Sequence, residues 1–164
     1  MKADLEAEFE SFVAATRDRL FRMAYAITRD PELAEHAAHA ALAAAYSRWK
    51  KVHDHRPEAY VRRMIVNEIL GFGRRRTAPV ASVDDMPLRR TDRSVVQTDA
   101  VWTALLELPV AQRAVIALRY YEGLPNAEIA DMFSTRPEIV QAQTTAALGD
   151  LRRLLTIARQ RART

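Results

Sequence analysis

Apolar residues recur every three or four positions along almost the whole chain, and this is the period of an α-helix. In the first thirty residues the recurrence gives one apolar stripe along a long helix. Its members are Leu5, Phe9, Phe12, Val13, Leu20, Met23, Ala24 and Ile27. No segment alternates between apolar and polar residues for long enough to indicate a β-strand. The sequence therefore predicts an all-α protein.

The first break in this pattern lies at Asp30 and Pro31. An aspartate side chain can cap the helix that follows it, and proline suits the first helical position. The second helix is rich in alanine and is expected to extend to about Trp49. The polar segment 50–56 is predicted to be the loop that separates it from a third helix.

The third helix is predicted to begin at Pro57 and to end at Gly71 and Gly73. Beyond these glycines the helical period disappears, and prolines, paired aspartates and scattered arginines take its place. About two dozen residues without periodicity are too many for a tight loop inside one compact domain. The predicted parts are a small helical domain over residues 1–76, a flexible linker over 77–98 and a second helical domain over 99–164.

Composition excludes several classes of function. The 164 residues include no cysteine, which rules out disulfides, thiolate metal sites and cysteine nucleophiles. No apolar run approaches the roughly 20 residues of a membrane span, and the acidic N-terminus lacks the order of a signal peptide. We therefore expect a cytoplasmic protein that has no membrane partner.

Catalytic and metal-binding patterns are weak. No glycine-rich phosphate loop or nucleophile–base pair is visible, so we expect neither an enzyme nor a cofactor or small-molecule substrate. His36 and His39 stand three positions apart on a predicted helix. Since no carboxylate or cysteine is clearly placed to complete a site, we interpret them as surface residues and expect no metal.

The net charge of +4 is a mild indication of a nucleic-acid partner, and its distribution is more informative. Between Glu58 and the end of the first domain, basic residues outnumber acidic ones. They are Arg62, Arg63, Arg74, Arg75 and Arg76. Arginines near a helix end suit phosphate oxygens, so this stretch is the first candidate for contact with nucleic acid.

Residues 124–155 have the pattern of a helix-turn-helix motif. A short helix (AEIADMF) is followed by a tight break at residues 134–136 and by a longer helix that starts near Pro137. Thr135 and Glu138 have the spacing of a capping box for the longer helix. In such motifs the second helix enters the major groove of DNA.

Both halves of the chain resemble the extracytoplasmic-function sigma factors, and the short actinobacterial type in particular. In the C-terminal half the resemblance lies in LELPVAQRAVIALRYYEGLPNAEIA, residues 106–130. In the N-terminal half it lies in AEHAAHAAL (34–42), WKKV (49–52) and AYVRRMIVNEILGFGRRR (59–76), in the family's order and spacing. The resemblance implies domains like sigma-70 regions 2 and 4, core RNA polymerase and promoter DNA as partners, and no enzymatic activity.

The resemblance also assigns residues to the minus-ten side of the promoter. They are Trp49, Arg62, Arg63, Asn67, Arg74, Arg75 and Arg76. Asn67 would hydrogen-bond an extruded base, and Trp49 would stack on one or lie against the transcription bubble. The alternative interpretation is that the arginines form a solvated face and that Trp49 belongs to the core.

On the helix that faces the polymerase clamp, the sequence departs from the family pattern. The family reads approximately AEDLVQEAL where this chain has AEHAAHAAL, so imidazoles at His36 and His39 replace an aspartate and a glutamine beside Glu35. Imidazoles donate hydrogen bonds and become positively charged below neutral pH. We therefore expect weaker contact with an arginine-bearing clamp through this face.

The recognition helix departs further. A family pattern near GCSVGTVKSRLSRAL becomes STRPEIVQAQTTAAL over residues 134–148, and about three cations are lost with it. Glu138 adds a carboxylate that would repel phosphates. Arg136, Gln141 and Gln143 remain as candidates for DNA contact, because glutamine can read adenine edges.

Two hypotheses about function follow. The first is a DNA-binding sigma factor with altered specificity. The second is a degenerate sigma-like protein that no longer initiates transcription alone and acts by binding another protein, such as an anti-sigma factor.

Overall fold

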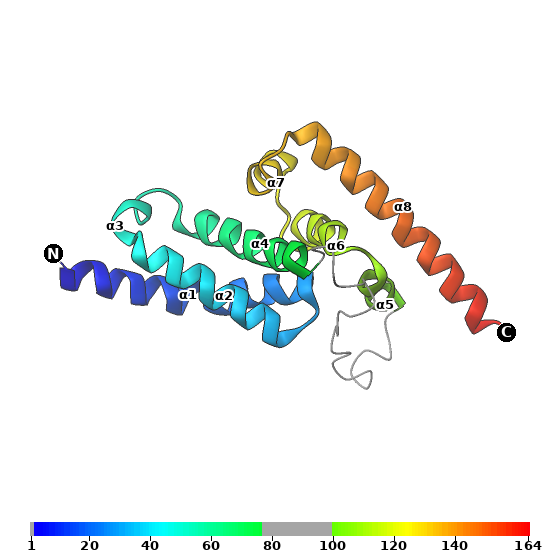
Figure 1. Ribbon diagram of the computed structural model, residues 1–164, viewed down its shortest axis with the longest axis horizontal. Coiled ribbons are helices and arrows are strands. Elements are labelled where there is room, and N and C mark those ends of the chain that lie inside the picture. Colours follow the sequence, from blue (N-terminus) through cyan, green and yellow to red (C-terminus); the bar gives the residue numbers. More distant parts are fainter. Residues whose placement is uncertain (1, 77–99) are drawn as a thin grey trace. The chain divides into compact units, whose positions relative to one another are not determined.

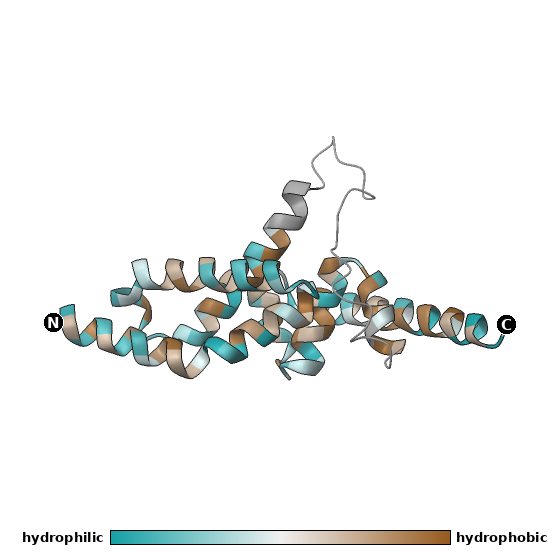
Figure 2. Cartoon of the chain, turned by 90° about the horizontal axis from the view of Figure 1, so that it is seen from below, coloured by the Kyte–Doolittle hydropathy of each residue, from teal (hydrophilic) through white to brown (hydrophobic). Residues whose placement is uncertain are grey.

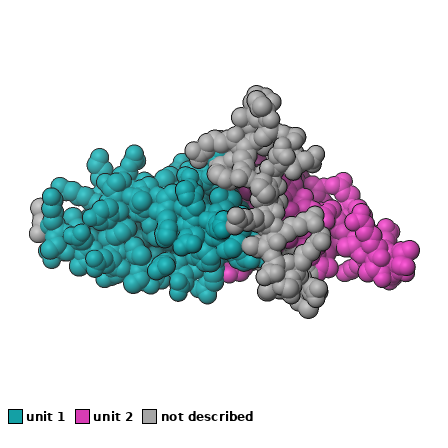
Figure 3. All heavy atoms as spheres, turned by 60° about the horizontal axis from the view of Figure 1, so that its bottom comes forward, with its two compact units in different colours: residues 1–81 teal, residues 82–164 magenta. Residues whose placement is uncertain are grey.

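The computed structural model describes residues 2–76 and 100–164, except for the side chains of residues 72–76 and of Trp102. The chain divides into two compact units, Met1–Ala81 and Ser82–Thr164, which are coloured separately in Figure 3. Within the described ranges every regular element is a helix, so the predicted all-α fold is confirmed. The predicted linker, residues 77–98, lies outside the described residues, and the domain bounds 1–76 and 99–164 stay a prediction.

The N-terminal unit consists of α1 (Lys2–Thr28), α2 (Pro31–Ser47), the short α3 (Trp49–Val52) and α4 (Pro57–Arg76). Helix α2 packs against both α1 and α4, as Figure 1 shows. The side of α2 that they cover is made of small residues, all buried: Ala34, Ala37, Ala38, Ala41 and Ala45. Small side chains at a contact let helix axes approach closely. The alanine-rich sequence of α2 therefore suits a helix that is covered on two sides.

Asp30 begins α2 in the predicted way. The backbone N–H groups of Glu32 and Leu33 donate to Asp30 Oδ1 at 3.0 and 3.2 Å, and Pro31 occupies the first turn. Two N–H groups that have no partner within the helix are thereby satisfied. The start of α2 is confirmed.

The predicted end of α4 is wrong. Gly71 and Gly73 both lie inside the helix, which continues to Arg76. Glycine ends a helix by adopting a left-handed conformation, and otherwise it costs only about 1 kcal/mol relative to alanine. The arginines that follow favour helix, so the chain continues through both glycines. The predicted loop 50–56 is also partly wrong, because α3 occupies its first residues.

The C-terminal unit consists of α5 (Ala100–Glu107), α6 (Val110–Ile116), η2 (Ala117–Tyr121), α7 (Asn126–Phe133) and α8 (Pro137–Ala162). Helix α8 packs against α5, α6 and α7. The residues at the centre of this unit are fully buried: Leu118, Ile129, Val140 and Ala147. Figure 2 shows hydrophobic and hydrophilic residues alternating along α8 as far as its C-terminal end.

A wide helical turn joins α6 to the helix-turn-helix motif. The N–H of Glu122 donates to the carbonyl of Ala117 at 3.0 Å, five residues back, which makes η2 a π-helical turn. Gly123 follows with φ +67°, a left-handed conformation that glycine adopts without steric cost. This turn redirects the chain toward α7.

The start of α8 corrects the predicted capping box. Arg136 is the N-cap residue of α8, and no side chain caps it. A capping box needs a serine or threonine at the N-cap and an acidic side chain at the third helical position. Thr135 and Glu138 each lie one position too early for this, although their mutual spacing is right. Pro137 at the first helical position, with its fixed φ, supplies the local preference for helix instead.

Candidate nucleic-acid and polymerase interfaces

Arg62 is held within the N-terminal unit by Glu58. Its Nη2 lies 2.8 Å from Glu58 Oε1, one turn earlier on α4, and the side chain is only 18% exposed. Glu58 also accepts a hydrogen bond from Arg19 of α1. The carboxylate therefore competes with any phosphate for the Arg62 guanidinium.

Arg63 and Asn67 are exposed and lie one turn apart on α4. Arg74, Arg75 and Arg76 form the last turn of α4, and their side chains lie outside the described part of the structure. The sequence predicted Arg62 and Arg63 as equivalent, whereas the structure leaves the Arg62 side chain 18% exposed and Arg63 exposed.

Trp49 lies in the core at the start of α3, with 5% of its surface exposed. Its ring centroid is 5.0 Å from that of Phe9 and 5.1 Å from that of Phe12, both on α1. The indole Nε1 is buried without a hydrogen-bond partner in the described part of the chain. This placement corresponds to the core interpretation. Stacking on a base stays a prediction, and it would require the ring to leave the aromatic cluster.

The three candidates for polymerase contact share the exposed side of α2. Glu35, His36 and His39 are all exposed. The His36 side chain is 65% exposed, and its Nε2 lies 3.7 Å from Glu68 Oε1 on α4. Over residues 2–76 and 100–164, no three ligand-type side chains gather as a metal site would require. The exposed side of α2 therefore carries one carboxylate and two imidazoles that a partner could contact.

The recognition helix α8 turns Val140, Thr144 and Ala147 into the core. Arg136, Gln141 and Gln143 are exposed, as is Glu138 in the first turn. The three predicted DNA-contacting residues are thus accessible at the N-terminal end of α8.

Gln141 differs from Gln143 because a neighbouring amide binds it. Asn126, the first residue of α7, donates from Nδ2 to Gln141 Oε1 at 2.9 Å. Asn126 was not among the residues that the sequence predicted. Nothing in the sequence indicates a contact across fifteen residues, and only the helix-turn-helix pattern predicts that the starts of the two helices lie near each other.

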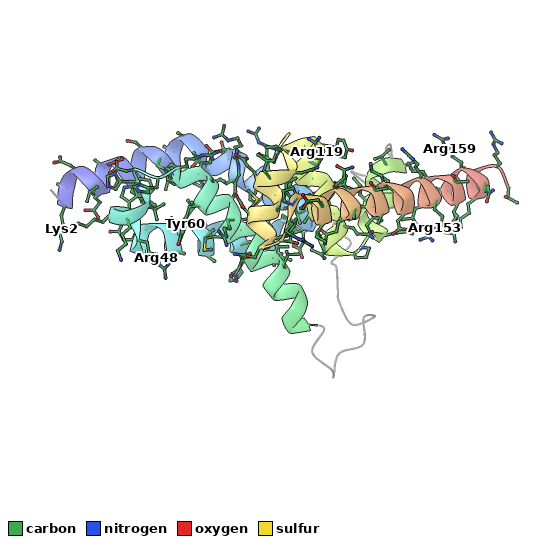
Figure 4. All side chains as sticks on the ribbon, turned by 90° about the horizontal axis from the view of Figure 1, so that it is seen from above. Lys2, Arg48, Tyr60, Arg119, Arg153 and Arg159 are labelled. Carbon is green, nitrogen blue, oxygen red and sulfur yellow. The ribbon has the colours of Figure 1, made fainter. Side chains whose placement is uncertain are left out.

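The last part of α8 is strongly basic. Five of the 25 lysines and arginines, and none of the 21 acidic residues, lie in residues 152–164. This segment therefore carries +5, and the other 151 residues together carry −1. Figure 4 shows Arg153 and Arg159 projecting from this end of α8.

Comparison with known proteins identifies both units. Residues 12–78 match the model of sigma-70 region 2, and residues 98–151 match that of sigma-70 region 4. The RNA polymerase sigma-E factor of Streptomyces coelicolor is 30% identical over 88% of this chain and 84% of its own length. The chain belongs to the RNA polymerase sigma-factor family. The sigma-E factor of Streptomyces avermitilis is similarly related, with 31% identity over 88% of this chain and 83% of its own.

A solved sigma factor has the same fold. The RpoE protein of Bartonella quintana, crystallised with the anti-sigma factor NepR, superposes with a TM-score of 0.66 at 18% identity. The match covers 91% of this chain and 97% of that one. These matches confirm the resemblance to sigma factors that was inferred from the sequence. Members of the sigma-factor family regulate transcription and are not themselves enzymes.

Two further findings bear on the interfaces of this family member. No helix in the described ranges is long and apolar enough to cross a membrane. The region 4 match ends at Leu151, so the basic segment 152–164 lies beyond the part of α8 that the family model covers.

Proposed function

We propose that this protein is a cytoplasmic sigma factor that binds core RNA polymerase and directs it to promoter DNA. The observation that carries the proposal is the relationship to sigma-E factors, which extends over both domains and 88% of the chain. A buried apolar core in each unit also supports the proposal.

In the N-terminal domain, Arg63 and Asn67 are the residues best exposed for DNA. The guanidinium of Arg63 would neutralise a backbone phosphate. The amide of Asn67 both donates and accepts, so it would hydrogen-bond the edge of a base extruded from the minus-ten element. Arg62 would contribute less, because Glu58 already holds it.

In the C-terminal domain, the N-terminal turns of α8 would enter the major groove at the minus-thirty-five element. Arg136 is the cation at the start of this helix, and Gln141 and Gln143 carry the amides that can reach base edges. Glu138 opposes phosphate contact. We therefore expect duplex binding in which base contacts matter more and salt-dependent attraction less than the family pattern implies.

Polymerase docking is proposed to involve Glu35, His36 and His39 on α2. Replacing the imidazoles by acceptors, in His36→Asp/His39→Gln, should tighten binding to core RNA polymerase by at least about tenfold, which corresponds to roughly 1.4 kcal/mol. Binding is measured by titration of labelled protein with purified core enzyme. His55→Gln, an exposed histidine away from this face, is the matched control. An unchanged affinity in the double variant would show that docking does not depend on these positions.

Run-off transcription tests the proposed function directly. Purified core enzyme and the protein are combined with a panel of genomic promoter fragments, and transcripts are mapped. A promoter-dependent transcript that requires this protein is the expected result. Absence of both core binding and a specific transcript would refute the proposal.

A second candidate function is a sigma-like protein that acts through another protein. The two exposed imidazoles on α2, in place of the family's aspartate and glutamine, favour it. The RpoE complex with NepR is an instance of a protein with this fold binding a protein other than polymerase. An affinity pull-down separates the two functions: a stoichiometric non-polymerase partner favours the second, and core polymerase as the main partner contradicts it.

A further inference from the structure

Two adjacent tyrosines are exposed at the end of the π-helical turn η2. Tyr120 and Tyr121 have 60% and 52% of their surface exposed. The proposed function gives neither of them a role. Each ring carries a hydroxyl group that both donates and accepts hydrogen bonds. The pair therefore presents two neutral hydrogen-bonding groups on the surface of the C-terminal unit.

The π-helical turn explains why Tyr121 lies at the surface. Leu118 is fully buried, and in a regular α-helix the residues three and four positions later lie on the same side. A regular helix would therefore turn Tyr121 toward the core. Because the N–H of Glu122 donates to the carbonyl of Ala117, the turn holds one more residue, and Tyr121 is displaced to the surface. Turns of this kind occur frequently at functional sites.

Hydrogen bonds connect this turn to the start of the helix-turn-helix motif. The N–H of Leu124 donates to the carbonyl of Leu118 at 3.0 Å, and Arg119 Nη1 donates to the carbonyl of Leu124 at 3.4 Å. Two residues later, Asn126 begins α7, and its side chain lies 2.9 Å from that of Gln141 in the second turn of α8. These contacts place the end of η2 at the end of the C-terminal unit where α8 begins.

Phosphate oxygens of DNA are the groups that this end of the unit would meet. In the proposed function the first turns of α8 enter the major groove, which is about 12 Å wide and has a phosphate backbone along each edge. An element beside the recognition helix therefore faces one of these backbones. Tyrosine hydroxyls are among the side-chain groups that donate to phosphate oxygens. Arg119 and Glu122 flank the pair with opposite charges, so the contact would be a neutral hydrogen bond.

We infer that Tyr120 and Tyr121 bind the phosphate backbone of the duplex promoter element through their hydroxyl groups. The inference rests on the proposed function, in which α8 enters the major groove. Such contacts fix the position of α8 on the duplex and carry no sequence information. Neutral donors suit this chain, because its recognition helix has about three cations fewer than the family pattern and Glu138 repels phosphates.

Fluorescence anisotropy of labelled duplex DNA with the polymerase-bound, full-length protein tests the inference. One duplex carries the upstream half of a promoter identified by run-off transcription, and the other is an unrelated sequence of the same length. Tyr120→Phe/Tyr121→Phe removes both hydroxyls and keeps both rings. The affinity for each duplex should fall at least about fivefold, the loss expected for one neutral hydrogen bond. The ratio of the two affinities should stay unchanged, because phosphates are common to both sequences.

Salt dependence separates a neutral contact from an ion pair. A hydroxyl group that leaves a phosphate takes up no counterion, so the double phenylalanine variant should keep the wild-type slope of log affinity against log salt. Arg136→Gln, by contrast, should reduce the magnitude of that slope by about 1. Tyr46→Phe is the matched control, since Tyr46 is 53% exposed in the N-terminal unit, and it should leave duplex affinity unchanged. Melting temperatures of all the phenylalanine variants should equal that of the wild type.

Each other outcome overturns the inference in a recognisable way. Wild-type affinity in the double phenylalanine variant overturns it and leaves duplex recognition by α8 intact. If only Tyr120→Ala/Tyr121→Ala weakens the complex, the rings make the contact, as they would with an apolar protein surface. A reduced salt slope or a lowered melting temperature in the phenylalanine variant also contradicts a neutral phosphate contact. If run-off transcription yields no promoter, or the wild-type complex binds neither duplex, the proposed function fails together with the inference.

Discussion

At the scale of single residues, burial decides what a substitution of Trp49 will do. Its indole packs against Phe9 and Phe12 and is 5% exposed. Trp49→Ala should therefore lower the free energy of unfolding of the N-terminal unit by about 3–5 kcal/mol, because it leaves a cavity in the aromatic cluster. Urea denaturation followed by circular dichroism measures the loss. Trp49→Phe, which keeps an aromatic ring, is the control and should lose less.

A different result would favour the DNA-contact interpretation of Trp49. If Trp49→Ala keeps its stability and loses promoter melting, the ring acts on DNA and not in the core. The sequence could not separate these roles, because Phe9 and Phe12 lie some forty residues earlier and helical periodicity does not show which helices meet. The same limit hid Asn126. The resemblance to the family pattern named Gln141 as a candidate for base contact, but only the packing of α7 on α8 shows that Asn126 binds its side chain.

At the scale of the helices, the predicted start or end of a helix was right where a few adjacent residues determine it. Asp30 and Pro31 supply both the cap and the first turn of α2, so the start of that helix was predictable. The end of α4 was not, because glycine permits termination without requiring it and the residues after Gly73 favour helix. The π-helical turn at residues 117–121 was also missed, since it adds one residue to a turn without interrupting the apolar pattern.

Arg62 and Arg63 differ in exposure on α4, because the Arg62 side chain is 18% exposed beside Glu58 whereas Arg63 is exposed. Arg63→Gln should weaken binding to promoter DNA and reduce the slope of log affinity against log salt by about 1, as expected when one phosphate contact is lost. Arg62→Gln should change the slope less, because Glu58 holds that guanidinium. Fluorescence anisotropy of labelled DNA with the polymerase-bound protein, at several salt concentrations, measures both slopes. Equal slopes for the two variants would show that Glu58 releases Arg62 when DNA binds.

At the scale of the whole molecule, the net positive charge of +4 is carried by the last thirteen residues. Residues 152–164 carry +5, and the remainder of the chain, including the arginine-rich end of α4, sums to −1. The segment is helical to Ala162, and the side chains of Arg152, Arg159 and Arg161 are exposed. The first turns of α8 have lost cations relative to the family pattern, while its last turns concentrate them. Electrostatic attraction to DNA is therefore expected to depend on the C-terminal end of this helix.

Neutralising that end tests whether it supplies the phosphate contacts that the recognition turns lack. Replacing all five arginines of residues 152–164 by glutamine changes the net charge from +4 to −1. If all five contact phosphates, the salt slope for duplex DNA should fall by as much as about 4.5, because each contact contributes about 0.9. The same five positions changed to lysine keep the charge and should keep most of the slope. A glutamine variant with the wild-type slope would mean that this segment stays away from DNA, and that its charge serves an acidic protein partner instead.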